Sequence, residues 1–163
     1  QKTILRLYAA LSAAVVLQCL PVPVLQIVGV VLMLGALGRV YGLRRRSDPE
    51  SLAYNHMTYL IRTVWISALF LLIGFAGASV WFYQVADHAA IHAAVDSILG
   101  GAIVDEAQIV NVLEAYKDAN FRLLVLASVF AAAPAILYFI FRVVKGLSRA
   151  SRGYRIASPK AWL

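Results

Sequence analysis

The chain has 163 residues, of which 62% are hydrophobic and 14% charged, and this composition is too apolar for a soluble domain of this size. The formal net charge of +7 would be compatible with nucleic-acid binding in a soluble protein, but here the basic residues cluster beside apolar segments. We therefore predict an all-α polytopic membrane protein that has no nucleic-acid partner.

Four segments are predicted to span a membrane as helices, since a span takes about 20 apolar residues. They lie at residues 4–20, 24–42, 57–83 and 121–144. Pro21 and Pro23 remove backbone donors between the first two, which predicts a tight helical hairpin. A cleavable leader is the competing interpretation of the first segment, but no Ala-x-Ala pattern follows, and we expect it to persist as a span. Residues 1–163 then form a single membrane domain, with an insertion at 84–120 and a basic tail at 145–163.

The charges are segregated between the two ends of these spans. Most of the acids lie within residues 84–120: Asp87, Asp96, Asp105, Glu106, Glu114 and Asp118. Apart from two, all the basic residues lie at the opposite ends of the spans or in the tail. Because short loops rich in Lys and Arg stay in the cytoplasm, we predict that both termini are cytoplasmic and that the insertion is extra-cytoplasmic.

Basic and aromatic residues gather where the predicted spans meet the cytoplasmic surface. Residues 43–50 carry three consecutive arginines, and each basic residue near an anionic leaflet contributes about 1 kcal/mol. Arg62 lies inside the third span and cannot lose its proton, so it must reach headgroups or another acceptor. We predict that these residues bind anionic phospholipids or partner subunits: His56, Arg62, Trp65, Arg142, Lys145, Arg44, Arg45 and Arg46.

Three pairs of small residues in the spans are spaced four residues apart. They are Ala10 with Ala14, Gly38 with Gly42 and Gly74 with Ala78. This spacing lets helix backbones approach closely, so we expect ordinary helix packing at these pairs.

The fourth span contains Pro134, which is expected to kink the helix. Beyond it, basic residues recur at helical spacing until Gly153, which is expected to end the helix. We expect the tail at 154–163 to contact the membrane interface or a partner.

The insertion at 84–120 is predicted to form two short amphipathic helices, separated at Gly100 and Gly101. We expect them to lie on the outer membrane surface or against a partner. His88, His92 and Asp96 are spaced four residues apart and would share one helix edge, which makes them weak candidate metal ligands. A solvated polar edge is the favoured interpretation, because no fourth ligand lies near in sequence.

Two segments carry a resemblance to a known family. Residues 56–65 read His-Met-Thr-Tyr-Leu-Ile-Arg-Thr-Val-Trp, and residues 139–146 read Phe-Ile-Phe-Arg-Val-Val-Lys-Gly. Together they resemble a family of small bacterial inner-membrane proteins of unknown function that is distantly similar to the Tic-type chloroplast import component. The resemblance covers most of residues 4–156. It implies four spans, a bacterial inner-membrane location, association with membrane complexes and a basic doorway formed by His56, Arg62, Arg142 and Lys145.

Two features depart from that family pattern. Val64 replaces the usual phenylalanine, and the 84–120 segment is much longer than the short link expected there. The longer segment indicates a partner peculiar to this chain.

No catalytic constellation or cofactor motif appears in the sequence. The leading hypothesis is therefore a non-enzymatic accessory or assembly subunit of a larger inner-membrane complex, which binds other membrane subunits through its spans and the insertion. A transport or translocation component and a metal-binding membrane protein are the alternatives. The first of these would need polar residues through the middle of the spans, where the sequence is almost wholly apolar.

Overall fold

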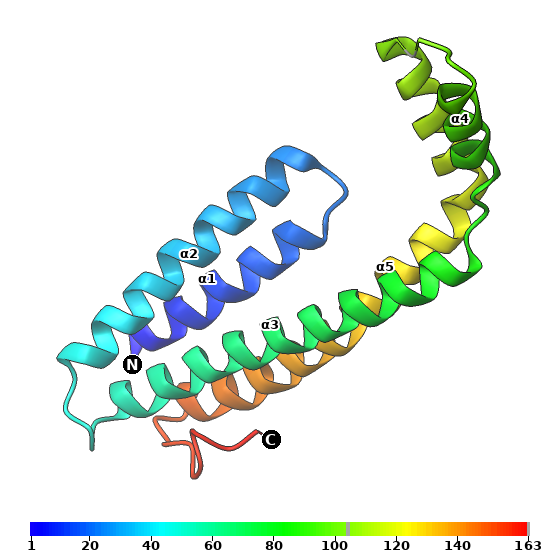
Figure 1. Ribbon diagram of the computed structural model, residues 1–163. Helices are drawn as coiled ribbons and strands as arrows, with labels where there is room; N and C mark the ends of the chain where they lie inside the picture. The colour runs from blue at the N-terminus through cyan, green and yellow to red at the C-terminus, as the bar shows by residue number, and fades with distance from the viewer. Residues whose placement is uncertain (104, 163) are drawn as a thin grey trace. The chain divides into compact units, whose positions relative to one another are not determined.

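The computed structural model describes residues 1–103 and 105–162, and all the regular structure in these ranges is α-helical (Figure 1). The described helices are α1 (Lys2–Cys19), α2 (Pro23–Arg46), α3 (Leu52–Val85), α4 (Ala89–Leu99) and α5 (Glu106–Ser151). The all-α prediction is confirmed.

Within the described residues, four helices are long and apolar enough to cross a membrane: α1, α2, α3 and α5. Most side chains in their most apolar stretches are not buried inside the protein, which is the opposite of a soluble helical bundle. Exposed apolar side chains lose nothing in hydrocarbon, so the structure indicates a membrane protein. The four predicted spans are confirmed as candidate spans.

The helices are longer than the spans that the sequence predicts. α3 has 34 residues and would extend about 51 Å at 1.5 Å per residue, whereas the hydrocarbon core is about 30 Å thick. α5 has 46 residues and exceeds the core by more. Both helices are therefore longer than the thickness of one hydrocarbon core.

The prediction of two separate helices in the insertion is half right. α4 ends at Gly100 and Gly101, where Gly101 has a φ of +89°, but the second piece is the first part of α5 and runs on into the fourth span. α5 begins with a capping box. The Asp105 carboxylate accepts from the backbone N–H of Gln108 at 2.8 Å, and the Gln108 side-chain oxygen accepts from the backbone N–H of Asp105 at 3.1 Å. No proline or glycine interrupts the helix before Pro134, so nothing ends it at residue 120.

The described chain divides into two compact units. Of the described residues, one comprises 1–69 and 135–162, and the other comprises 70–103 and 105–134. α3 and α5 each contribute to both, and the boundary on α5 falls next to Pro134. We refer to these as the terminal unit and the insertion unit.

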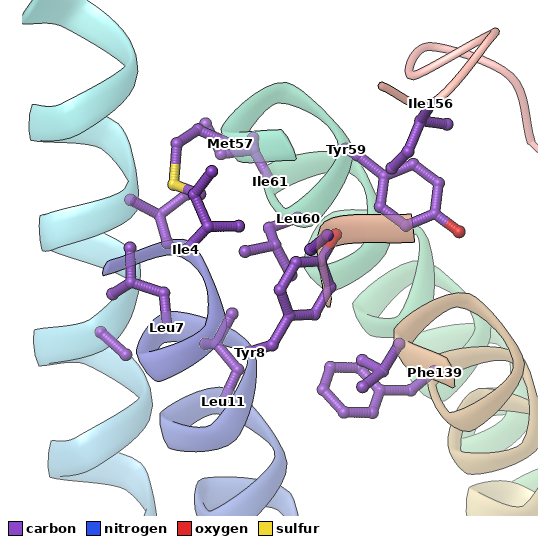
Figure 2. Packing of buried hydrophobic residues seen from close by; sticks show 14 residues of the cluster. Ile4, Leu7, Tyr8, Leu11, Met57, Tyr59, Leu60, Ile61, Phe139 and Ile156 are labelled. Atoms are coloured by element: carbon purple, nitrogen blue, oxygen red, sulfur yellow. The ribbon is translucent and has the colours of Figure 1, made fainter. Parts of the chain in front are cut away.

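The terminal unit has a core built from α1, α2, α3, α5 and the tail (Figure 2). Tyr8 of α1, Leu60 of α3 and Phe139 of α5 lie together in it, and Ile156 of the tail lies beside Tyr59. In a membrane the alternative to this core is lipid, which is also apolar. Close van der Waals packing and hydrogen bonds must therefore hold the helices together.

Small residues allow close helix contacts at positions that the spacing only partly predicts. In the insertion unit, Gly74 of α3 faces the Ala131 backbone of α5 so closely that an added Cβ would collide with the carbonyl group. In the terminal unit, Gly29 of α2 meets the Ala14 carbonyl oxygen of α1 in a similar way. Gly38 and Gly42, in contrast, face open space among the described residues.

Candidate functional site

Buried polar side chains form a cluster in the terminal unit, where α1, α3, α5 and the tail meet. We call it the polar cluster, and it comprises Tyr8, Asn55, His56, Tyr59, Thr63 and Arg142. Consecutive turns of α3 supply four of these residues, so one face of a single helix sets most of the geometry. Buried polar groups destabilise a fold unless they are hydrogen-bonded, so the stability of the terminal unit depends on the hydrogen-bond partners of these side chains.

Arg142 is the centre of the cluster and is fully buried. Its guanidinium carbon lies 3.8 Å from the centroid of the Tyr59 ring, a cation–π contact. Its Nε donates to the Thr63 hydroxyl at 3.2 Å, and its Nη1 donates to the Ala161 carbonyl at 2.8 Å. The Tyr59 hydroxyl in turn donates to the Arg142 backbone carbonyl at 3.0 Å. α3 therefore contacts the plane of the guanidinium and one of its N–H donors, and the tail accepts from another.

His56 connects three parts of the terminal unit. Its Nδ1 lies 3.0 Å from the Tyr8 hydroxyl of α1, and its Nε2 lies 3.0 Å from the Tyr154 carbonyl of the tail. Since a carbonyl only accepts, Nε2 carries a proton, and in the neutral imidazole Nδ1 then accepts from the tyrosine hydroxyl. The neutral ring thereby fastens the first span and the tail to α3.

The tail folds back onto its own helices. The Asn55 side chain donates to the Ile156 carbonyl at 3.0 Å and accepts from the Ile156 N–H at 2.8 Å, which is a reciprocal pair. The Tyr138 hydroxyl donates to the Trp162 carbonyl at 2.6 Å. Gly153, with a φ of +75°, follows the end of α5 as the sequence predicts and turns the chain back. The expectation that the tail contacts the membrane interface or a partner did not include this docking.

Docking of the tail changes the interpretation of two predicted binding residues. His56 and Arg142 are both fully buried, and their contacts are with α1, α3 and the tail. In this structure the chain itself covers both side chains, and their role in binding lipid or a partner stays a prediction. The sequence places both residues at the doorway but carries no sign that residues beyond Gly153 would cover them.

The guanidinium of Arg142 has no carboxylate partner in the part of the chain that the structure describes. The ion pair found there joins Lys117 and Asp118 in the insertion unit, at 3.6 Å. The Arg142 Nη2 atom is buried without a hydrogen-bond partner among the described residues. Within the described residues, the positive charge is faced by the Tyr59 and Tyr138 rings and by the Thr63 hydroxyl and Ala161 carbonyl oxygens.

The remaining predicted binding residues lie nearer the surface. Arg62 is half-buried and its Nε has no hydrogen-bond partner among the described residues. Lys145 is exposed, with its Nζ 5.6 Å from the Phe141 ring centroid. Trp65 is also exposed, and its Nε1 donates to the Tyr41 hydroxyl of α2 at 2.7 Å. These residues do not join the polar cluster through any contact that the structure shows.

The three consecutive arginines at the end of α2 lie in different surroundings. Arg44 and Arg45 line a hollow of about 630 Å³, whereas Arg46 lies outside it. The other residues of its lining are Tyr41, Gly42, Ser47, Pro49 and Tyr54. The lining contains no acid, and we call this place the arginine hollow.

The candidate metal ligands are placed in the insertion unit, and only part of the expected edge forms. α4 begins at Ala89, so His88 precedes the helix. The His88 Nε2 lies 2.9 Å from the Tyr83 carbonyl, and its ring stacks on Tyr116 at 5.8 Å. His92 and Asp96 are exposed. Among the described residues, no group of three metal-ligating side chains comes together.

Asn120 of α5 binds the short connection between α3 and α4, a contact that the sequence analysis did not predict. Its side-chain oxygen accepts from the Asp87 N–H at 2.8 Å, and its amide nitrogen donates to the carbonyls of Asp87 and Tyr116 at 2.9 Å each. The side chain is almost wholly buried. A lone asparagine beside an apolar run carries no periodic signal, so only the structure reveals this clamp.

Comparisons with family models, with curated proteins and with solved structures find no match to this chain.

Proposed function

We propose that the protein is a non-enzymatic accessory or assembly subunit of a larger membrane complex, and that the α4 segment is part of its partner surface. One observation carries this proposal. α4 buries none of its residues although it is a regular apolar helix. An apolar face that its own fold leaves uncovered is the usual mark of an interaction surface.

The uncovered face of α4 is continuous. Ile91, Val95 and Ile98 follow each other at four and three residues, so they share one side of the helix, and all are exposed. Ile109 and Leu113, in the first turns of α5, are exposed as well. The helix-in-groove mode of recognition uses such a row of apolar anchors.

The polar side of α4 favours a protein over a lipid surface as the occupant. Helices that lie on membranes carry Lys and Arg on the polar face, which attract anionic headgroups. α4 contains neither residue within Ala89–Leu99, and its charged side chain is Asp96. Because α4 has no basic side chain to attract anionic headgroups, a partner subunit is the favoured occupant of the apolar row.

The polar cluster supports a structural role in this proposal. Its histidine, asparagine and arginine bind the chain's own tail, and the cluster contains no acid that could act with them as a base. No specific contact favours the transport or metal-binding alternatives, and neither is advanced. The proposed location is a bacterial inner membrane, with both termini in the cytoplasm and residues 84–120 outside. The resemblance to the four-span family is likewise a proposal.

The subunit proposal is tested with a photoreactive amino acid at position 95, introduced into the full chain in its native membrane. We expect a discrete protein adduct after illumination, together with migration of the tagged chain in a species much larger than its 17.8 kDa. The double change Ile91→Ser and Ile98→Ser should abolish both results. The matched control, His92→Ser with Asp96→Ser on the neighbouring side of α4, should leave them intact. Lipid adducts alone, or equal loss in the control, would contradict the proposal.

The proposed topology is tested by cysteine labelling in a Cys19→Ala background. A cysteine at Glu106 should react with a membrane-impermeant reagent added from outside, and a cysteine at Arg46 should react only after the membrane is opened. The reverse pattern would overturn the assignment of sides.

A further inference from the structure

We propose that the arginine hollow binds the phosphate group of an anionic phospholipid. The inference needs the candidate membrane spans but does not depend on the proposed subunit role. It follows from which side chains surround the hollow, how one arginine is held there, and what lies next to it on α2.

One wall of the hollow is an arginine held in place by an aromatic ring. The Arg44 guanidinium carbon lies 5.2 Å from the Tyr54 ring centroid, and its Nη2 donates to the Tyr54 hydroxyl at 3.4 Å. The Arg44 Nε is buried and has no hydrogen-bond partner among the described residues. A guanidinium that is held in position at the wall of the hollow is suited to a charge-assisted contact with phosphate.

The charge around the hollow is uncompensated. Arg45 also lines it, and its side chain is exposed. The nearest acids in sequence are Asp48 and Glu50, but the Asp48 carboxylate accepts from the Glu50 N–H at 2.7 Å, and neither residue lines the hollow. No ion pair between these acids and the arginines occurs in the described residues. Two cations without an anion beside them leave room for an anionic ligand.

The position of the hollow indicates that the phosphate belongs to a lipid. Tyr41 lines the hollow and accepts from Trp65 at 2.7 Å, and Tyr and Trp side chains gather at the headgroup level of membranes. Val30 and Leu34 precede Tyr41 by eleven and seven residues on α2, so all three fall on one side of that helix. Both aliphatic side chains are exposed. They form an apolar stripe along which an acyl chain can lie while its phosphate occupies the hollow.

The matched variants come from adjacent arginines. Arg45 and Arg46 are both exposed and carry the same charge, but only Arg45 lines the arginine hollow. The purified full chain in neutral detergent is titrated with phosphatidylglycerol, and native mass spectrometry gives the dissociation constant of the first bound lipid. We expect Arg45→Gln to weaken this binding about tenfold and Arg46→Gln to change it less than about threefold, since a direct charge-assisted contact is lost in only one of them.

A second variant tests the geometry of the site. Arg44→Lys keeps the positive charge but removes the planar fork, so we expect binding to weaken by at least about fivefold. Circular dichroism must show unchanged helicity in each variant. Because Arg45 is exposed, Arg45→Gln keeps the test valid even if a change at Arg44 disturbs folding.

Three results would overturn the proposal. Equal weakening by Arg45→Gln and Arg46→Gln would show that the lipid is attracted by the overall positive charge of this surface and not bound in the arginine hollow. Equal affinity for phosphatidylglycerol and phosphatidylcholine would show that the anionic phospholipid is not selected. Displacement of the bound lipid by millimolar inorganic phosphate would assign the hollow to a soluble ligand.

Discussion

The contact between Gly74 and Ala131 predicts that replacing Gly74 with alanine destabilises the insertion unit. The new Cβ would meet the Ala131 carbonyl oxygen and lie 3.0 Å from the carbonyl carbon and 3.1 Å from the Cα. All three atoms are backbone, so no side-chain rotation relieves the collision, and α3 and α5 must separate. Overpacking of this kind costs about 1–3 kcal/mol.

Helix propensity acts in the opposite direction. Alanine is favoured over glycine inside a helix by about 1 kcal/mol, so Gly74→Ala would stabilise α3 if the contact were absent. The net expectation is a loss of up to about 2 kcal/mol in the free energy of unfolding, or up to about 30-fold in the equilibrium constant. Gly77 lies one turn further along α3 and faces open space among the described residues, which makes Gly77→Ala the matched control. It should be neutral or stabilising.

The assay is reversible unfolding of the purified full chain in detergent micelles with increasing sodium dodecyl sulfate, followed by circular dichroism. We expect the midpoint of Gly74→Ala to fall below that of the natural chain and the midpoint of Gly77→Ala to equal or exceed it. The reasoning is refuted if the two variants unfold at the same midpoint, because propensity alone would then explain both.

Three further predictions concern the polar contacts. Asn55→Ala removes both hydrogen bonds to Ile156, and we expect faster cleavage of the tail by added protease, whereas equal cleavage rates would contradict the docked tail. Arg142→Met removes a buried charge that has no carboxylate partner among the described residues and should destabilise the chain by less than about 2 kcal/mol, as measured by the same unfolding assay; a loss of about 3–5 kcal/mol would instead reveal a buried counter-charge. Asn120→Ala leaves the Asp87 N–H and carbonyl without their partner and should speed amide hydrogen exchange at residues 86–90, while unchanged exchange would contradict the clamp.

Much of the fold follows from the sequence alone. Apolar runs of span length predict α1, α2, α3 and α5, because a membrane-crossing backbone must satisfy its hydrogen bonds internally and a helix does so within one segment. Proline and glycine mark the breaks after α1 and α4 correctly. The start of α5 could also have been predicted, since Asp105 and Gln108 have the spacing of a capping box.

The polar cluster and the arginine hollow could not be predicted, because no local sequence pattern shows which distant residues come into contact. Residues beyond Gly153 show neither the periodicity of a helix nor the alternation of a strand, so their docking on Asn55, His56 and Arg142 is invisible in sequence. Likewise, nothing in the sequence distinguishes Arg44, Arg45 and Arg46. In the structure Arg44 and Arg45 line the arginine hollow, Arg46 does not, and Arg44 lies over the Tyr54 ring. Local composition determines which segments are helices in a membrane, because that depends on each segment's own backbone hydrogen bonds. Which polar groups meet depends on contacts between residues far apart in the sequence, as with Tyr59 and Arg142 at a separation of 83, and only the packed structure decides those.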